Sequence, residues 1–183
     1  MKLVIIEGMD RCGKDSIIDL ISQDHFIHSI THWGYPVGNT NEEKTEWQKT
    51  SFLDYMSKWK NVQSNSLDSL VVWNRAHVGE YVYGTMYRDS YPDTWIPDLE
   101  EKYLSDDNVY LVLLHADPEF LLKHDDGNSY TTQLELEKLE HEKFQTAFDS
   151  STIKNKIKIK VSHGDNYSDI NDIYSIIVEA ISI

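Results

Sequence analysis

The sequence predicts a three-layer α/β fold in which a five-stranded parallel sheet lies between two layers of helices. Two observations carry this prediction. Short apolar runs alternate along the chain with segments of helical periodicity, which is the pattern of strand–helix–strand units. In addition, a glycine-containing loop joins the first apolar run directly to the first helical segment. The 183 residues fit one domain, 1–183, without a linker or repeat.

Five apolar runs provide the expected strands. In chain order they are 2–7, 25–33, 70–73, 108–115 and 156–161. The first, third and fourth are almost continuously apolar, as strands covered on both faces should be. The last alternates strictly, and the lysines that flank and occupy it are Lys154, Lys156, Lys158 and Lys160. Such lysines are typical of an edge strand protected from pairing with another sheet, which we prefer to a nucleic-acid-binding patch.

Helical periodicity fills the intervals between these runs. The expected helices are 13–23, 42–63, 77–87, 98–104, a short one from Asp117, then 131–149 and 169–181. Pro92 and Pro97 are expected to bracket a loop. The apolar stripe expected on the helix 42–63 is Trp47, Phe52, Tyr55, Met56 and Trp59. Core packing explains these aromatic residues, and so would a homodimer interface.

Composition narrows the classes of partner. Acidic residues outnumber basic ones 31 to 17, for a net charge of −14, whereas a protein that grips a nucleic-acid backbone usually carries a basic surface. We therefore expect a small-molecule substrate. No apolar run approaches the ~20 residues of a membrane span. Cys12 is the single cysteine and cannot form an internal disulfide, so we expect a reducing cytoplasm.

The glycine loop carries the chemistry. Residues 8–14 match the pattern GxxxxGK of phosphate-binding loops. Glycines let successive backbone N–H groups turn inward around phosphate oxygens, and the following helix directs its positive end at the same anion. The lysine then reaches the terminal phosphates. The pattern predicts a P-loop NTPase fold that binds ATP through Gly8, Met9, Asp10, Arg11, Cys12, Gly13, Lys14, Asp15 and Ser16.

One position in the loop departs from the common pattern. The residue after the lysine is usually Ser or Thr, whose hydroxyl binds Mg²⁺, but here it is Asp15, followed by Ser16. A carboxylate is a competent Mg²⁺ ligand, and it also adds negative charge beside the nucleotide phosphates. We expect Mg²⁺ dependence, with Asp15 or Ser16 as the metal ligand.

Arginine is scarce, which makes each one informative. The chain has three, Arg11, Arg75 and Arg88, against fourteen lysines. A guanidinium offers a rigid fork of donors that suits phosphate. Arg75 follows Asn74 at the carboxyl end of the third strand, the edge at which open α/β sheets bind ligands. Arg88 ends the following helix, where it could bind substrate or only complement the helix dipole.

Together these segments resemble the thymidylate kinase family and its deoxynucleoside kinase relatives, some of them virus-encoded. The residues 6–14, IEGMDRCGK, resemble the family's EGxDxxGK loop. Tyr35-Pro36 resembles its Phe-Pro segment, and Asn74-Arg75 its Asp-Arg motif. The segment from Asp117 and the break 125–129 (DDGNS) resemble the helix and lid that close over ATP. The resemblance spans almost the whole chain and implies a nucleoside monophosphate kinase-like fold.

The resemblance also implies roles for particular residues. Asp10 would bind the sugar 3′-hydroxyl of the acceptor, and Arg75 would bind phosphate at the transfer site. Tyr35 would flank the acceptor, Gln48 would read its base, and adenine would lie near 162–167. The lid, 124–131, lacks the family's arginines, so Arg11 is expected to act as an arginine finger from within the loop. The expected catalytic residues are Lys14, Arg11 and Arg75, with Arg88 as a further substrate residue.

The acceptor remains open between several classes. A nucleoside needs a carboxylate base, and the segment after the second strand, 32–36 (HWGYP), has no acid. A nucleoside monophosphate needs cations, which Arg75 and Arg88 supply, so dTMP or a related pyrimidine deoxynucleotide is favoured. The alternatives are a deoxynucleoside kinase, a DNA-base or polynucleotide kinase, and a nonenzymatic nucleotide-binding module, the last suggested by Asp15 and Asn74.

Overall fold

The computed structural model describes residues 1–62, 69–125, 127 and 132–182. Its strands are β1 (Lys2–Gly8), β2 (Ile27–His32), β3 (Leu70–Asn74), β4 (Val109–His115), β5 (Asn155–Lys160), β6 (Ser162–His163) and β7 (Asn166–Tyr167). Its longer helices are α1 (Lys14–Asp24), α2 (Asn41–Val62), α4 (Ile96–Tyr103), α6 (Leu134–Ser150) and α7 (Ile170–Ile181). Its shorter helical segments are η1 (Glu80–Gly84), α3 (Thr85–Tyr87), η2 (Pro92–Thr94) and α5 (Pro118–Lys123).

The predicted five-stranded parallel sheet is confirmed. Its strand order is β2-β3-β1-β4-β5, and every pairing is parallel. The chain moves from β1 to one side of the sheet for β2 and β3, then to the other side for β4 and β5. The order therefore reverses around β1, and the loop that follows β1 lies at the point where such sheets bind ligands. β5 is an edge strand, as its lysines predicted.

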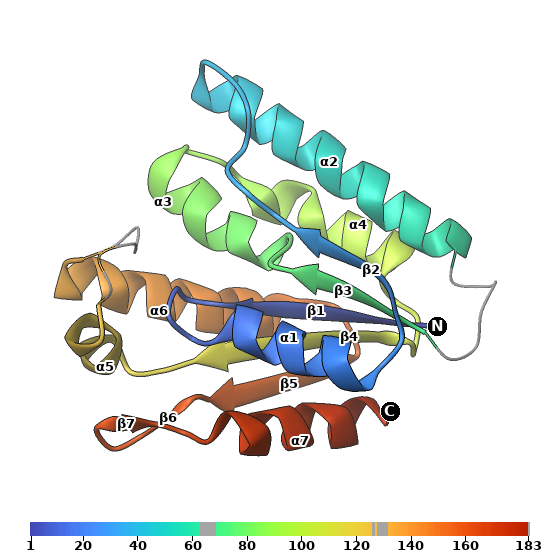
Figure 1. Cartoon of the computed structure of the whole chain (residues 1–183). Coiled ribbons are helices and arrows are strands. Elements are labelled where there is room, and N and C mark those ends of the chain that lie inside the picture. Colours follow the sequence, from blue (N-terminus) through green and yellow to red (C-terminus); the bar gives the residue numbers. More distant parts are fainter. Residues whose placement is uncertain (63–68, 126, 128–131, 183) are drawn as a thin grey trace.

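Helices cover both faces of this sheet (Figure 1). The helices α1 and α7 pack against each other on the face turned toward the viewer. The segment η1–α3, α4 and α6 lie on the far face, and α2 packs against α4. Most residues of the central strands are buried, because helices exclude water from both of their sides. No helix within the described ranges is long and apolar enough to cross a membrane.

The helix predicted at about 77–87 is confirmed, but it contains a π-helical turn, η1, in which a Cβ on Gly84 would lie 2.4 Å from Glu80 Oε1, so glycine leaves room for that carboxylate. Two other local predictions were wrong. Pro97 lies in the first turn of α4 rather than in a loop, a position where its missing N–H costs nothing. Trp47 and Tyr55 of α2 are each 37% exposed, because Gln48 occupies the buried face in their place.

A buried carboxylate ties three parts of the far layer together. Glu100 of α4 is 2% exposed, and its oxygens lie 2.7 Å from His77 Nε2 and accept hydrogen bonds from Ser151 Oγ (2.7 Å) and the Thr152 backbone N–H (2.6 Å). Burial by itself would raise the pKa of Glu100, but the contacts with His77 and Ser151 bring it down to about 2. The network therefore favours the ionised carboxylate.

We expect Glu100→Ala to lower the free energy of unfolding by about 3 kcal/mol, since it leaves several buried polar groups without their acceptor. Because the folded pKa of Glu100 is depressed, its contribution is present above pH 4.5 and is lost as the pH falls toward 2. Urea unfolding at pH 7 and pH 3 measures both effects. Glu101→Ala, at the exposed neighbouring position, is the control. Equal stability of the two variants at pH 7 would contradict the network's role.

Candidate nucleotide-binding site

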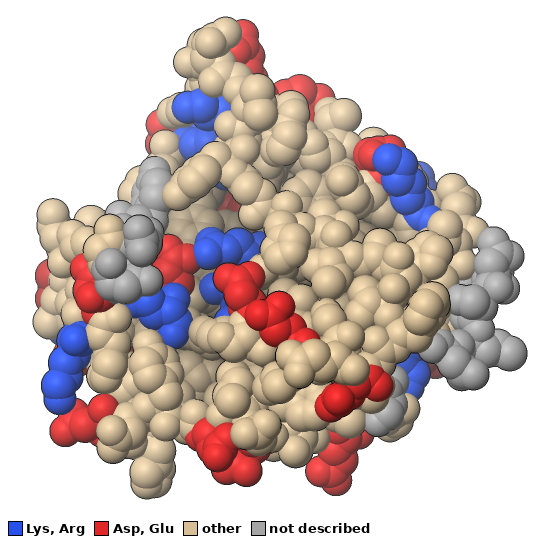
Figure 2. All heavy atoms as spheres, in the orientation of Figure 1, with Lys and Arg blue, Asp and Glu red and all other residues tan. Residues whose placement is uncertain are grey.

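A cavity of about 660 Å³ opens at the carboxyl edge of β1, β2 and β3. In Figure 2 basic and acidic side chains lie side by side around the hollow near the centre of this face. The cavity brings together most of the residues that the sequence singled out. Its lining comprises Asp10, Arg11, Gly13, Lys14, Asp15, Ser16, Trp33, Gly34, Tyr35, Pro36, Gln48, Asn74, Arg75, Ala76, Gly79, Glu80, Tyr83, Tyr87, Arg88, His124 and Tyr167.

The loop between β1 and α1 has the backbone that its glycines predicted. Gly8 has a φ of 143°, and a Cβ there would lie 2.1 Å from the Leu114 carbonyl oxygen, so only glycine fits between β1 and β4. Gly13 has a φ of 76° and precedes the first turn of α1. Gly8, Met9 and Cys12 were also predicted to bind the nucleotide but are not among the residues that line the cavity, and the side chains of Met9 and Cys12 are buried.

Lys14 folds back over the loop that precedes it. It is 6% exposed, and its ammonium group donates to the carbonyl oxygens of Gly8 (2.8 Å) and Met9 (2.6 Å). Burial lowers the pKa of Lys14, and the nearby guanidinium of Arg75 lowers it further. The site therefore holds a partly desolvated cation at the start of α1, whose charge an incoming phosphate would stabilise.

The two unusual positions of the sequence contact each other. The Asn74 side-chain amide donates to Asp15 Oδ1 at 2.5 Å and lies 2.9 Å from His32 Nδ1. Asp15 belongs to the first turn of α1, whereas Asn74 ends β3 and His32 ends β2. Asn74 Oδ1 is buried and has no hydrogen-bond partner among the described residues. The Asp15 carboxylate therefore lies at the edge of the cavity together with the Asn74 side-chain oxygen, and only the latter lacks a partner among the described residues.

Arg75 is held in a strained backbone conformation next to the loop. Its φ is 65°, in the left-handed region that non-glycine residues rarely occupy, and its guanidinium forms an ion pair with Asp10. The buried carboxylate of Glu7 fixes the backbone that follows, accepting the N–H groups of Ala76 (2.7 Å) and Gly79 (3.3 Å). Two residues predicted to contact the acceptor, Asp10 and Arg75, are thereby locked to each other at the cavity wall.

Arg11 points away from the transfer position expected for it. Its guanidinium donates to the Leu121 carbonyl oxygen at 2.7 Å, forms an ion pair with Glu137 of α6, and lies 3.4 Å from an Asp125 oxygen. Only 6% of its side chain is exposed. In this conformation Arg11 fastens the loop to α5 and α6, and acting as an arginine finger would require it to leave these partners.

Glu137 makes this fastening sensitive to pH. Burial raises the pKa of Glu137 to about 7, although Arg11 opposes the shift. The folded protein therefore binds a proton more tightly than the unfolded chain, so stability falls as the pH rises from 4.5 to 7, by at most about 1.4 kcal/mol per pH unit for this group.

We expect Glu137→Gln to remove that part of the pH dependence, because glutamine does not ionise. The difference in unfolding free energy between wild type and variant should shift in favour of the variant as the pH rises from 5 to 8, as measured by urea unfolding. Glu142→Gln, at an exposed position of the same helix, is the control. A difference that stays constant across this range would show that Glu137 is ionised throughout.

The wall opposite the loop combines predicted and unpredicted residues. Tyr35 is 79% exposed, whereas Gln48 is 6% exposed and its side-chain oxygen has no partner among the described residues. Arg88 forms an ion pair with the buried carboxylate of Glu80, and burial raises the pKa of Glu80. Sequence reasoning missed Glu80 together with Tyr83 and Tyr87, which also line the cavity. Their spacing of three and four, directly after a strand end, is the signal that could have found them.

One part of the cavity wall belongs to a small aromatic cluster. The ring centroids of Phe120 and His124 lie 4.2 Å apart, and those of His124 and Tyr167 lie 5.2 Å apart. His124 and Tyr167 line the cavity, and Tyr167 belongs to the β6–β7 hairpin, inside the segment 162–167 where adenine was expected. Most of the predicted lid, 124–131, lies outside the described residues, which include only 124, 125 and 127 of it.

Comparison with known proteins finds similarity in structure but not in sequence. No protein-family model matches the sequence, and no curated protein matches it. Solved structures match over nearly the full chain. YorR from Bacillus subtilis, solved in complex with phosphorylated GDP, has a TM-score of 0.70 at 17% identity and covers 98% of this chain and 95% of its own.

Two thymidylate kinases match almost as well. The enzyme from Candida albicans has a TM-score of 0.66 at 13% identity, covering 99% of this chain and 91% of its own. That from Ehrlichia chaffeensis has a TM-score of 0.66 at 11% identity, covering 98% of both chains. Such low identities leave the substrate undetermined, but the predicted fold is confirmed. The chain has the fold of the thymidylate kinases.

Proposed function

We propose that this chain is a nucleotide kinase that transfers a phosphoryl group from ATP to a nucleoside monophosphate, with dTMP or a related pyrimidine deoxynucleotide as acceptor. The observation that carries the proposal is one cavity shared by Lys14 of the phosphate loop and by Arg75 and Arg88 from the far side of the switch point. A cavity lined by a phosphate-loop lysine and by arginines from a second segment suits two phosphorylated ligands whose reacting groups meet there.

The groups in this cavity suit in-line transfer. Lys14 and the backbone of the loop would hold the phosphates of ATP, with its adenine against His124 and Tyr167. Arg75 would bind the acceptor phosphate, and Asp10, its ion-pair partner, would turn to the sugar hydroxyl. Gln48 and Arg88 would contact the acceptor base. Catalysis then rests on positioning and charge neutralisation rather than on a covalent intermediate.

The donor set fits Mg²⁺ bound together with a nucleotide. The described residues contain no group of three or more His, Cys, Asp or Glu side chains that could hold a metal ion on their own. Mg²⁺ usually binds one or two carboxylates plus substrate phosphates, and it would neutralise charge on the transferring group. Asp15 and Ser16, at the start of α1 beside Lys14, are the residues that would hold it.

The alternative acceptors make different demands on the site. A nucleoside needs a carboxylate base, and each of the cavity's acids Asp10, Asp15 and Glu80 already contacts a cation or an amide. A nucleic-acid acceptor conflicts with the net charge of −14. We therefore expect free nucleotides as substrates, in a reducing cytoplasm. Burial raises the pKa of Cys12 to about 11, so its thiol is unreactive there.

A substrate panel tests the proposal. Nucleosides and nucleoside monophosphates, including dTMP and, because of the YorR complex, guanine nucleotides, are each incubated with ATP and Mg²⁺ while ADP release is followed. Turnover with a pyrimidine deoxynucleoside monophosphate is expected. Turnover of nucleosides alone would show that the acceptor is a nucleoside rather than a nucleoside monophosphate. ATP binding without any turnover would indicate a nonenzymatic nucleotide-binding module.

A further inference from the structure

Asp15 follows the loop lysine and Asn74 ends β3, and the carboxylate and the neutral side chain typical of these two positions are exchanged. In P-loop NTPases the residue after the lysine is typically Ser or Thr, and an aspartate from a neighbouring strand completes the Mg²⁺ site. Here the residue after Lys14 is the aspartate, and the end of β3 carries the neutral amide. We propose, on the basis of the kinase function above, that Asp15 is the carboxylate that anchors nucleotide-bound Mg²⁺ and that Asn74 positions it.

The sheet register brings the two residues together. β1 pairs with β3 so that Ile6 lies opposite Asn74, which places the end of β3 beside the loop that leads to α1. The Asn74 amide then reaches Asp15 Oδ1 at 2.5 Å across 59 residues of sequence. The two positions are therefore close enough for an amide at one to hold a carboxylate at the other.

Asn74 is built to hold Asp15 in place. It is 6% exposed, and its amide nitrogen also lies 2.9 Å from His32 Nδ1, so β2 and β3 together fix its orientation. Its oxygen is buried at the cavity wall without a partner among the described residues. A buried amide oxygen in this position can accept a hydrogen bond or coordinate a cation, and a metal ion or its bound water would supply either interaction.

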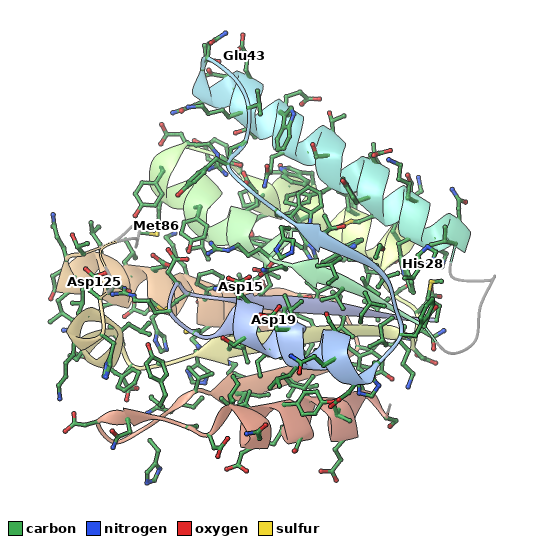
Figure 3. All side chains as sticks on the ribbon, in the orientation of Figure 1. Asp15, Asp19, His28, Glu43, Met86 and Asp125 are labelled. Carbon is green, nitrogen blue, oxygen red and sulfur yellow. The ribbon has the colours of Figure 1, made fainter. Side chains whose placement is uncertain are left out.

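Asp15 itself is exposed at the start of α1 (Figure 3). Without a metal ion its negative charge lies beside the position of the nucleotide phosphates and repels them. With a divalent ion bound, the same charge attracts the metal–nucleotide complex. The sign of its effect on nucleotide affinity should therefore reverse when the metal is added, which a residue with a purely structural role would not cause.

The test measures binding of a fluorescent ADP analogue to the full chain in EDTA and in Mn²⁺, with Mn²⁺ occupancy followed by electron paramagnetic resonance. Asp15→Asn should bind ADP about threefold more tightly than wild type in EDTA and about tenfold more weakly in Mn²⁺. Asp19→Asn is the matched control, because Asp19 lies one turn further along the exposed surface of α1 and does not line the cavity (Figure 3). It should change neither constant.

The decisive variant moves the carboxylate from position 15 to position 74. Asp15→Asn combined with Asn74→Asp keeps one carboxylate and one amide in the pair and should restore Mn²⁺-dependent binding to within about threefold of wild type. If thermal melting shows that it does not fold, Asp15→Ser with Asn74→Asp makes the same comparison. Failure of the folded exchange variant to recover, or an Asp15→Asn effect of the same sign in EDTA and in Mn²⁺, would overturn the inference.

The outcomes separate this inference from the proposed function. If wild type binds ADP and Asp15→Asn binds it equally well in Mn²⁺, the role of Asp15 is overturned while the nucleotide site stands. Wild-type protein that binds ADP neither in EDTA nor in Mn²⁺ would overturn both.

Discussion

Replacing Lys14 with alanine should lower kcat/KM for phosphoryl transfer by about 10²- to 10³-fold while the protein remains folded. The ammonium group lies at the start of α1, where the loop amides and the helix dipole already favour an anion. Its loss removes the one lysine among the cavity's lining residues, the group proposed to turn from the loop carbonyls to the transferring phosphate. Initial rates at varied ATP and acceptor concentrations measure the change.

Stability should respond much less than activity to the same substitution. Burial lowers the pKa of Lys14, which means that the fold itself holds this cation at a cost. Its removal relieves that cost and leaves only two carbonyl oxygens, those of Gly8 and Met9, without a donor next to an open cavity where water can replace it. Lys14→Met, which keeps the length of the side chain, should be as inactive as Lys14→Ala. Lys154→Ala, at an exposed lysine, should keep full activity.

If Lys14→Ala retained wild-type kcat/KM, the assignment of the phosphate loop would be wrong. If it lost activity only because it unfolded, thermal melting would reveal this, and Lys14→Met would still separate the charge from the packing of the side chain. Loss of activity together with unchanged ADP affinity in EDTA would place the role of Lys14 in the transfer step rather than in binding.

The elements nearest the sheet's centre were the easiest to predict. The runs 2–7, 70–73 and 108–115 are apolar because helices cover both sides of their strands, so composition and structure follow from the same cause. The lysine-bearing run 156–161 was recognisable for the opposite reason, since its outer edge is left unpaired. The phosphate loop was predictable because its glycines stand where the backbone has a positive φ, at Gly8 and Gly13, and Gly8 also leaves no room for a Cβ.

The pairing of charges at the site could not be predicted from local sequence. Each arginine of the cavity has an acidic partner that is not its neighbour in the sequence: Arg11 with Glu137, Arg75 with Asp10, and Arg88 with Glu80, eight residues earlier. These contacts depend on which elements become neighbours in the fold. The Glu80 contact also depends on a π-helical turn, which the periodicity of the sequence does not predict. The sequence therefore indicates the right residues but not the direction in which each guanidinium points.

These ion pairs change what the arginines can be expected to do. An acceptor phosphate must compete with Asp10 for Arg75, whose side chain is 35% exposed, and with the buried Glu80 for Arg88, whose side chain is 11% exposed. Breaking the more buried pair costs more, because Glu80 would be left as an uncompensated buried charge. Arg75 is accordingly the arginine that we expect to turn to a phosphate, while Arg88 is expected to remain with Glu80.

Replacing Arg75 with alanine should therefore lower kcat/KM for a nucleoside monophosphate by about 10²- to 10³-fold, mostly through a higher acceptor KM, and should leave the KM for ATP near its wild-type value. Arg75→Lys should recover part of the loss, since lysine restores the charge but not the forked geometry. Steady-state kinetics with each substrate varied in turn measure these changes.

The ion pair with Asp10 makes the Arg75 prediction sharper. Asp10→Asn weakens the partner that competes with the acceptor phosphate, so it should improve phosphate binding at Arg75 while it impairs contact with the sugar hydroxyl. A dideoxy acceptor, which lacks the 3′-hydroxyl, should thus bind Asp10→Asn better than it binds wild type, and this gain should vanish in Asp10→Asn combined with Arg75→Ala. A gain that survives without Arg75 would show that the acceptor phosphate is not bound by this guanidinium.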